Sequence, residues 1–213
     1  MTRPLAIAHR AGNDLAALKA ALDAGVDLIE ADVRPYRDAL ELRHARSLGP
    51  HLLWDRWTVR RRGAVPRLPE LLAETAAQGR LMLDLKGPSW TLAPRVAAHL
   101  RELAPGVPVT VCTKQWSMLD SFAGDSHVRD VLSVANRAAL TRLRARLRRR
   151  PAAGVSIRLD LLSAEVVAEI RARAPLVMVW PVRTRADLAR ARRIGATGII
   201  SADPSVLGEV LGS

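Results

Sequence analysis

The stretch LAIAHRAGNDLAALKAALDAGVDLIEADVR, residues 5–34, contains a strand, a helix and a second strand in succession. LAIAHR (5–10) and VDLIEADVR (26–34) are apolar runs of strand length. Between them, NDLAALKAALDAG (13–25) has apolar residues at helical spacing, an Asn-Asp pair that offers a cap, and a glycine at its end. Two strands joined by one helix are typical of a parallel sheet.

The same alternation continues to the end of the chain. Further strands are expected at 81–87, 107–112, 130–136, 154–160, 176–182 and 197–203, and further helices at 68–79, 91–106, 117–124, 137–150, 163–174, 184–195 and 204–212. Leaving aside a short run at 39–44, eight main strands result, so the sequence predicts an α/β fold, a (β/α)8 TIM-type barrel in one compact domain over residues 1–213. The irregular stretch 45–67 is expected to be a long surface loop.

An open doubly wound sheet is the rival architecture. Such a sheet usually has a glycine-rich phosphate turn after its first strand, and this chain has HRAGND there. Composition fits either fold, because 49% of the 213 residues are apolar and can form a full core. The single cysteine, Cys112, excludes an intrachain disulfide, and no apolar stretch has the length of a signal peptide or a membrane span. A cytoplasmic protein is therefore expected.

The chain carries a net charge of +12, mostly from arginine. Such a surface favours anionic partners. In the basic run at 141–150, Leu140, Leu143 and Leu147 share one face, which predicts an outer helix with a solvated basic side. A patch that makes weak contact with an anionic membrane surface is the alternative. With only 3% aromatic residues, stacking platforms are scarce, and no specific nucleic-acid partner is expected.

Acidic residues sit at regular spacing inside two of the expected strands. Glu30 and Asp32 are two apart, so their side chains point to one face of a strand, and Asp84 and Lys86 repeat the spacing. Buried carboxylates are costly unless they are paired or bind a metal. Carboxylate oxygens that meet at one barrel mouth favour Mg²⁺ or Ca²⁺.

Three further residues complete a candidate site. His9 and Arg10 end the first strand, and His44 ends the short run at 39–44. Histidines exchange protons near neutral pH, and the planar guanidinium of an arginine suits a phosphate. Carboxylates, paired histidines and an arginine together are suited to cleaving a phosphate ester.

The combination resembles a known family, the glycerophosphodiester phosphodiesterases of the phosphatidylinositol-phospholipase-like barrel group. The resemblance rests on His9-Arg10, Glu30-x-Asp32 and His44. It extends to VPRLPELLAETAAQGRLMLDLKG (65–87) and to LVMVWPVRTRADLARARRIGATGIISADPSVL (176–207), so it covers most of the chain.

The resemblance implies a role for each candidate residue. It assigns the general acid and base to His9 and His44, phosphate binding to Arg10 and Lys86, the pocket wall beside glycerol to Trp180, and a divalent metal, Mg²⁺ or Ca²⁺, to Glu30, Asp32 and Asp84. The implied reaction is metal-dependent hydrolysis of a small anionic phosphodiester to sn-glycerol 3-phosphate and an alcohol. Attack by water and attack by the neighbouring glycerol hydroxyl both stay open.

Several residues differ from the family pattern. The loop after Arg10 is short, Asp84 replaces a longer glutamate, Ala45 follows His44 in place of an acid, and Arg183 stands where a neutral amide is common. A more basic pocket would suit a substrate with a second anionic group. Two alternatives remain: a lysophospholipase D-type activity, and a non-catalytic barrel that binds anionic lipid or nucleic acid.

Other residues have simpler interpretations. Lys86 can merely pair with Asp84, and Cys112 reads as a small buried filler. Surface positions are expected for His51, His99 and His127. Core packing is expected for Trp54, Trp57, Trp90 and Trp116, with the lining of a lipid or sugar pocket as the alternative.

Overall fold

The computed structural model describes residues 3–55, 57–75 and 78–212. Its main element is a barrel of eight parallel strands: β1 (Leu5–Ala8), β2 (Leu28–Tyr36), β7 (Leu81–Leu85), β8 (Val109–Thr113), β9 (Val128–Val134), β10 (Gly154–Arg158), β11 (Leu176–Trp180) and β12 (Gly198–Ser201). β1 pairs with β2 on one side and with β12 on the other, so the sheet closes on itself. The predicted (β/α)8 barrel is confirmed.

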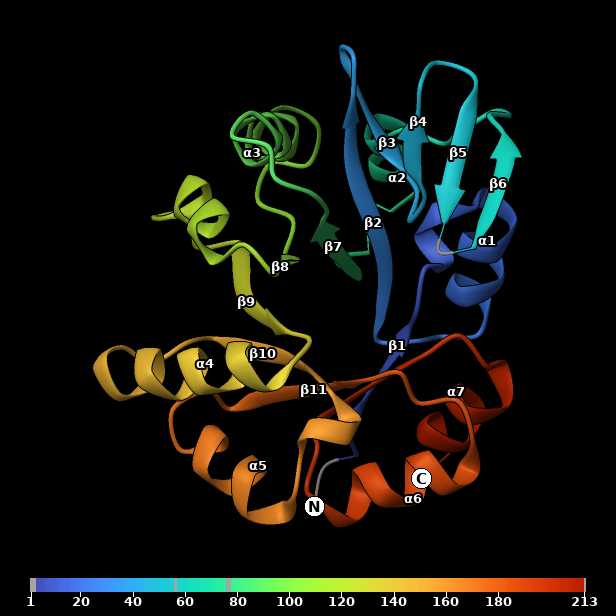
Figure 1. The fold of residues 1–213 in the computed structure, drawn as a ribbon. Coiled ribbons are helices and arrows are strands. Elements are labelled where there is room, and N and C mark those ends of the chain that lie inside the picture. Colours follow the sequence, from blue (N-terminus) through green and yellow to red (C-terminus); the bar gives the residue numbers. More distant parts are fainter. Residues whose placement is uncertain (1–2, 56, 76–77, 213) are drawn as a thin grey trace.

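Helices surround the barrel (Figure 1). They are α1 (Leu15–Asp23), α2 (Leu68–Thr75), α3 (Leu92–Leu103), α4 (Arg137–Arg149), α5 (Ala164–Arg171), α6 (Arg185–Arg193) and α7 (Pro204–Leu211), with the 3₁₀ turns η1 (Ala11–Asn13), η2 (Trp116–Phe122) and η3 (Leu159–Leu161). The helix expected at 117–124 is the 3₁₀ helix η2. Within the described ranges, no helix has the length and apolar character needed to cross a membrane.

Helix caps follow the sequence signals. Of the two candidate caps of α1, Asp14 takes the role, because its carboxylate accepts from the backbone N–H groups of residues 16 and 17. Asn13 is therefore left to contact another element. In α4, the three leucines of the apolar face are buried while arginines occupy the remaining surface, as predicted for an outer helix.

An antiparallel insertion follows β2. β3 (Ala39–Leu42) returns alongside β2, and β4 (Arg46–Leu48), β5 (Leu52–Asp55) and β6 (Thr58–Arg61) form a separate small sheet. The expectation of a surface loop over 45–67 is therefore wrong. Strands β4 and β6 are exposed along their length, so they lack the alternation of apolar and polar residues that marks a half-buried strand.

The turn η1 packs directly on the inner strand β2. A Cβ atom added to Gly12 would lie 2.7 Å from Cβ of Ala31 and 3.3 Å from the backbone oxygen of Glu30. Real Cβ atoms do not approach so closely, so only glycine lets this turn lie against the strand that carries two acidic residues.

We predict that Gly12→Ala destabilises the fold. The added methyl group forces η1 away from β2, which costs about 1–3 kcal/mol of the free energy of unfolding by the usual scale for overpacking. Gly208→Ala in α7 is the matched control, because no heavy atom lies within 4 Å of its added Cβ. Urea denaturation measures both, and wild-type stability of Gly12→Ala would contradict this account of the packing.

Candidate active site

A cavity of about 510 Å³ opens at the carboxyl ends of the barrel strands. It brings together most of the residues predicted from the sequence: His9, Arg10, Glu30, His44, Asp84, Lys86 and Trp180 line it. The eighth, Asp32, is fully buried and contacts two of these lining residues. A larger groove of about 890 Å³ lies beside the β2–β3 hairpin and contains none of the eight. The predicted site residues therefore gather at the carboxyl-terminal face of the barrel, where barrel enzymes have their active sites.

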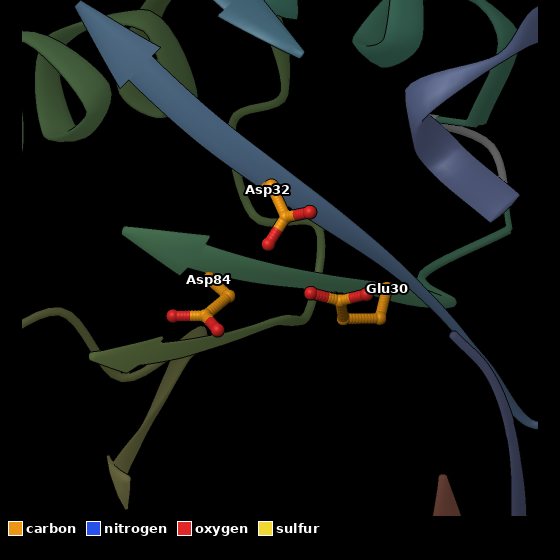
Figure 2. Close-up of side chains that lie close together, drawn as sticks. All are labelled: Glu30, Asp32 and Asp84. Carbon is orange, nitrogen blue, oxygen red and sulfur yellow. The ribbon is translucent and has the colours of Figure 1, made fainter. Parts of the chain in front are cut away.

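The three acidic residues converge beneath this cavity (Figure 2). β2 and β7 are parallel neighbours, and their register puts Asp32 opposite Asp84. Glu30, two positions earlier, shares the strand face of Asp32. One oxygen from each carboxylate lies within 4.8 Å of the others. All three side chains are buried, so the cluster needs positive charge nearby.

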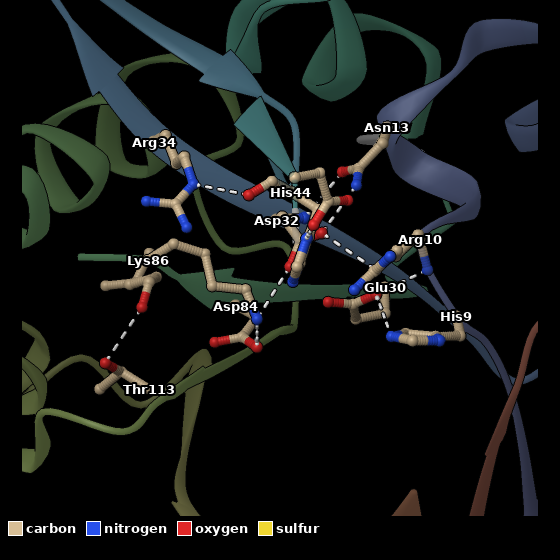
Figure 3. Close-up of polar contacts among 12 residues, drawn as sticks. His9, Arg10, Asn13, Glu30, Asp32, Arg34, His44, Asp84, Lys86 and Thr113 are labelled. Carbon is tan, nitrogen blue, oxygen red and sulfur yellow. Dashed lines mark hydrogen bonds and ion pairs between the residues drawn. The ribbon is translucent and has the colours of Figure 1, made fainter. Parts of the chain in front are cut away.

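Lys86 supplies part of that charge. Its Nζ lies 2.8 Å from Oδ1 of Asp32 and in direct contact with Oδ2 of Asp84. Burial alone would raise the pKa of Asp32, but Lys86 together with His44 and Asn13 outweighs burial and lowers it. Burial would likewise lower the pKa of Lys86, and the carboxylates raise it instead. The pairing of Lys86 with Asp84 noted as a simpler interpretation therefore exists, and it includes Asp32 (Figure 3).

Glu30 has less compensation. Its Oε2 accepts a hydrogen bond from the backbone N–H of Arg10 at 2.6 Å and lies 4.0 Å from Nε2 of His9. Burial, followed by repulsion from Asp32, raises the pKa of Glu30 well above its usual range. One carboxylate of the cluster is thus unfavourable as an anion unless further positive charge arrives.

A divalent cation fits this donor set. Oδ1 of Asp84 is buried and accepts no hydrogen bond from the described residues. Glu30 and Asp84 therefore both have carboxylate capacity that their protein neighbours do not use. Buried carboxylate oxygens are the ligands that Mg²⁺ and Ca²⁺ prefer. The shorter side chain of Asp84 still brings its carboxylate into the cluster with the other two.

Arg10 and Asn13 fix the carboxylates from the β1–α1 loop. Arg10 adopts a left-handed backbone conformation with φ of 60°, uncommon for a residue other than glycine, and Nε lies 3.5 Å from Oδ2 of Asp32. Asn13 Nδ2 donates to Asp32 at 2.8 Å, and its Oδ1 accepts from the Asp32 backbone N–H at 2.8 Å. Sequence reasoning did not assign this role to Asn13, because the contact spans 19 positions.

The two histidines reach the cavity from different elements. His9 follows β1, and His44 follows β3. Burial, and then the charge of Arg10, lower the pKa of His9 to about 4. Burial also lowers the pKa of His44. These environments favour the neutral form of both imidazoles, in which a ring can accept a proton.

His44 has an acidic partner that the sequence did not reveal. Its Nδ1 lies 2.9 Å from Oδ1 of Asp55, at the end of β5. Ala45, the residue after His44, has no acidic group. The inserted sheet provides a carboxylate to the ring through Asp55. A carboxylate in this position orients the ring and stabilises its protonated form.

Trp180 forms one wall of the cavity at the end of β11. Lys114 Nζ lies 5.5 Å from the centre of its indole ring. Cys112 also lines the cavity and is buried, and burial followed by the nearby Asp84 charge raises the pKa of its thiol. A neutral thiol packed at the floor agrees with the expected filler role.

Some peripheral expectations differ from the structure. Trp57 and Trp90 are 97% and 96% exposed, so core packing is wrong for both. Trp54 is largely exposed on β5, whereas Trp116 packs against the core and donates to a backbone oxygen. Two of the remaining histidines, at 51 and 127, are exposed as expected, and the one at 99 is half-buried.

Comparisons with known proteins place the fold. No family model matches the chain, and no curated protein matches it. Solved structures do. An Oleispira antarctica phosphodiesterase in complex with the product sn-glycerol-3-phosphate is 20% identical with a TM-score of 0.75, over 99% of this chain and 98% of that one. A glycerophosphodiester phosphodiesterase from Thermotoga maritima is 16% identical with a TM-score of 0.77, over 99% and 100%.

A third solved structure agrees with these two. The glycerophosphodiester phosphodiesterase from Parabacteroides distasonis is 14% identical with a TM-score of 0.77, over 99% of this chain and 98% of that one. The whole described chain therefore has the fold of solved glycerophosphodiester phosphodiesterases.

We predict that Glu30→Gln weakens Mg²⁺ and Ca²⁺ binding by at least about tenfold, because cation affinity follows the number of charged ligands. Isothermal titration calorimetry of the purified protein measures the affinity without any reaction. Glu209→Gln on α7 is the matched control, since this carboxylate pairs only with surface arginines among the described residues. Equal affinity in wild type and Glu30→Gln would exclude Glu30 as a ligand.

Proposed function

We propose that this protein is a metal-dependent phosphodiesterase that hydrolyses glycerophosphodiesters to sn-glycerol 3-phosphate and an alcohol. One observation carries the proposal: a buried carboxylate cluster and two histidines share a single cavity at the carboxyl ends of the barrel strands. The Oleispira antarctica neighbour, bound to sn-glycerol-3-phosphate, supports the assignment of substrate.

Phosphate binding would fall to cationic residues around the cluster. The guanidinium of Arg10 and the ammonium of Lys86 both line the cavity, and both are held by Asp32. They would orient the phosphodiester and favour its negative charge. Glu30, Asp32 and Asp84 would hold a divalent cation, which when bound supplies further stabilisation of charge on the phosphate oxygens.

His9 and His44 would move the protons. The attacking oxygen, whether of water or of the substrate's own glycerol hydroxyl, loses its proton to one imidazole. The other imidazole must be in its protonated form, and it gives that proton to the leaving alkoxide, which is a poor leaving group without it. Asp55 would stabilise the protonated form of His44 and hold its ring in place.

A lysophospholipase D-type activity at the same site is the second candidate. Trp54 lines a groove that continues from the cavity, and the fully exposed Trp57 follows three residues later in the chain. Exposed indole rings beside an active site suit contact with an acyl chain or a lipid surface. The reaction on phosphate would be the same.

We predict that wild-type protein with Mg²⁺, Ca²⁺ or Mn²⁺ releases glycerol 3-phosphate from glycerophosphocholine and glycerophosphoethanolamine. EDTA should abolish the release. His9→Ala and His44→Ala should each lower kcat by about 10²–10⁴, the usual contribution of one proton transfer. An enzyme-coupled glycerol 3-phosphate assay measures the rates.

His127→Ala is the matched control, because that residue is exposed and outside the cavity. Activity on lysophospholipid but on neither soluble diester would favour the second candidate. Absence of turnover on all of these substrates with every metal would exclude catalysis and leave a binding protein.

The histidines also set an expected pH dependence. The imidazole that accepts a proton must be neutral, and the pKa of both histidines lies below the ordinary value of 6.5. A cation held by the carboxylate cluster would lower both pKa values further. The acid-side fall of kcat/KM, which reports the free enzyme, should therefore have its midpoint below pH 6.5. A pH–rate profile measures it, and a midpoint at or above 6.5 would contradict the environment described for these rings.

A further inference from the structure

We propose that the substrate's alcohol carries a second anionic group, and that Arg34, Arg46 and Lys114 bind it in a groove beside the catalytic cavity. The inference rests on the proposed function and narrows its substrate class. The second anionic group can be a phosphate or a carboxylate, since a guanidinium binds both in the same planar manner.

The groove continues directly from the cavity. It has a volume of about 520 Å³ and shares His44, Asp84, Lys86 and Lys114 with the catalytic cavity. The carboxyl ends of β7 and β8 form one side, and the inserted sheet forms the other through Arg46 and residues of β5. A substrate held at the carboxylate cluster would therefore extend one of its two ester groups into this groove.

The groove is lined by more cationic side chains than carboxylates. The two carboxylates that line it, Asp55 and Asp84, are engaged by His44 and Lys86. Among the described residues, neither Arg34 nor Arg46 nor Lys114 forms an ion pair with a carboxylate. Three cations around one groove that have no carboxylate partner among the described residues are suited to an anion from outside.

Arg34 is held in position for that role. Its Nε donates to the backbone oxygen of His44 at 3.0 Å (Figure 3). The loop after β7 passes close to its guanidinium at Gly87, where an added Cβ would lie 3.4 Å from Nη1 and φ is 90°. A partly buried guanidinium among other cations gains most from an arriving anion.

A plain phosphodiester does not account for these residues. Its single negative charge already faces Arg10, Lys86 and the proposed cation at the cluster. Trp180 and Pro181 in the same cavity offer an apolar surface that suits the carbon face of glycerol. The cationic groove is then left for the alcohol, which must bring its own negative charge to use it.

The experiment compares substrates that differ by one anionic group. The first pair is glycerophosphoglycerol without and with a terminal phosphate, and the second is glycerophosphoethanolamine and glycerophosphoserine. Wild type should favour the more anionic member of at least one pair by about tenfold or more in kcat/KM, mainly through KM, as expected for charge-assisted hydrogen bonds. The pair that responds identifies the anionic group as phosphate or carboxylate.

Variants locate the effect. Arg46→Gln and Lys114→Gln should each lower the preference ratio severalfold, and the preference should weaken with salt. Arg60→Gln, an exposed arginine of β6 outside the groove, is the charge-matched control and should leave the ratio unchanged. A loss of preference in Arg183→Gln alone would place the anion on the Trp180 wall and overturn the proposal.

Binding separates this proposal from the proposed function. Calorimetry with His9→Ala protein measures the affinity for both members of each pair without turnover. Turnover of every diester with no preference, in rate or in binding, would overturn the second-anion site and leave the phosphodiesterase standing. Preferential binding of the more anionic ligands with no turnover by wild type would support the site and overturn the phosphodiesterase.

Discussion

The burial of three carboxylates at one end of the barrel is the constraint on which the site depends. Anions removed from water require ion pairs or hydrogen bonds, and here residues of several elements provide them. Lys86 lies between two of them, Asn13 holds Asp32 with two hydrogen bonds, and the strained backbone of Arg10 turns its N–H toward Glu30. Loss of one partner from such a buried pair typically costs about 3–5 kcal/mol. The loops around the site are therefore shaped by charge as much as by packing.

The position of the insertion after β2 depends on another buried carboxylate, that of Glu41. Glu41 on β3 contacts Arg43 at 2.6 Å and Arg62 at 2.6 Å, which ties β3 to the segment that follows β6. Arg43 also donates to the backbone of Ala45. This network fixes both ends of the small sheet, which would otherwise be too exposed to hold its own position. His44 and Asp55 meet at the cavity because the sheet between them is held in this way.

Periodicity in the sequence was sufficient for the barrel, because its strands and helices bury regular faces. The spacing of Glu30 and Asp32 likewise predicted the carboxylate cluster, since strand geometry alone puts them on one face. Asn13 and Asp55 could not be found in this way, because each acts through a contact that only the folded chain creates. The sheet within 45–67 was missed for a related reason: its outer strands are exposed on both faces and carry no pattern of burial.

The closure of the barrel by β12 has a consequence for synthesis on the ribosome. The acidic residues and both histidines belong to the first part of the chain, up to β7, but β1 finds one of its two partners only in β12. The backbone N–H of His9 donates to the oxygen of Ser201 at 2.8 Å, so this contact of the histidine forms only when β12 docks. A nascent chain would carry the acidic cluster with an open sheet edge beside it until β12 has been synthesised.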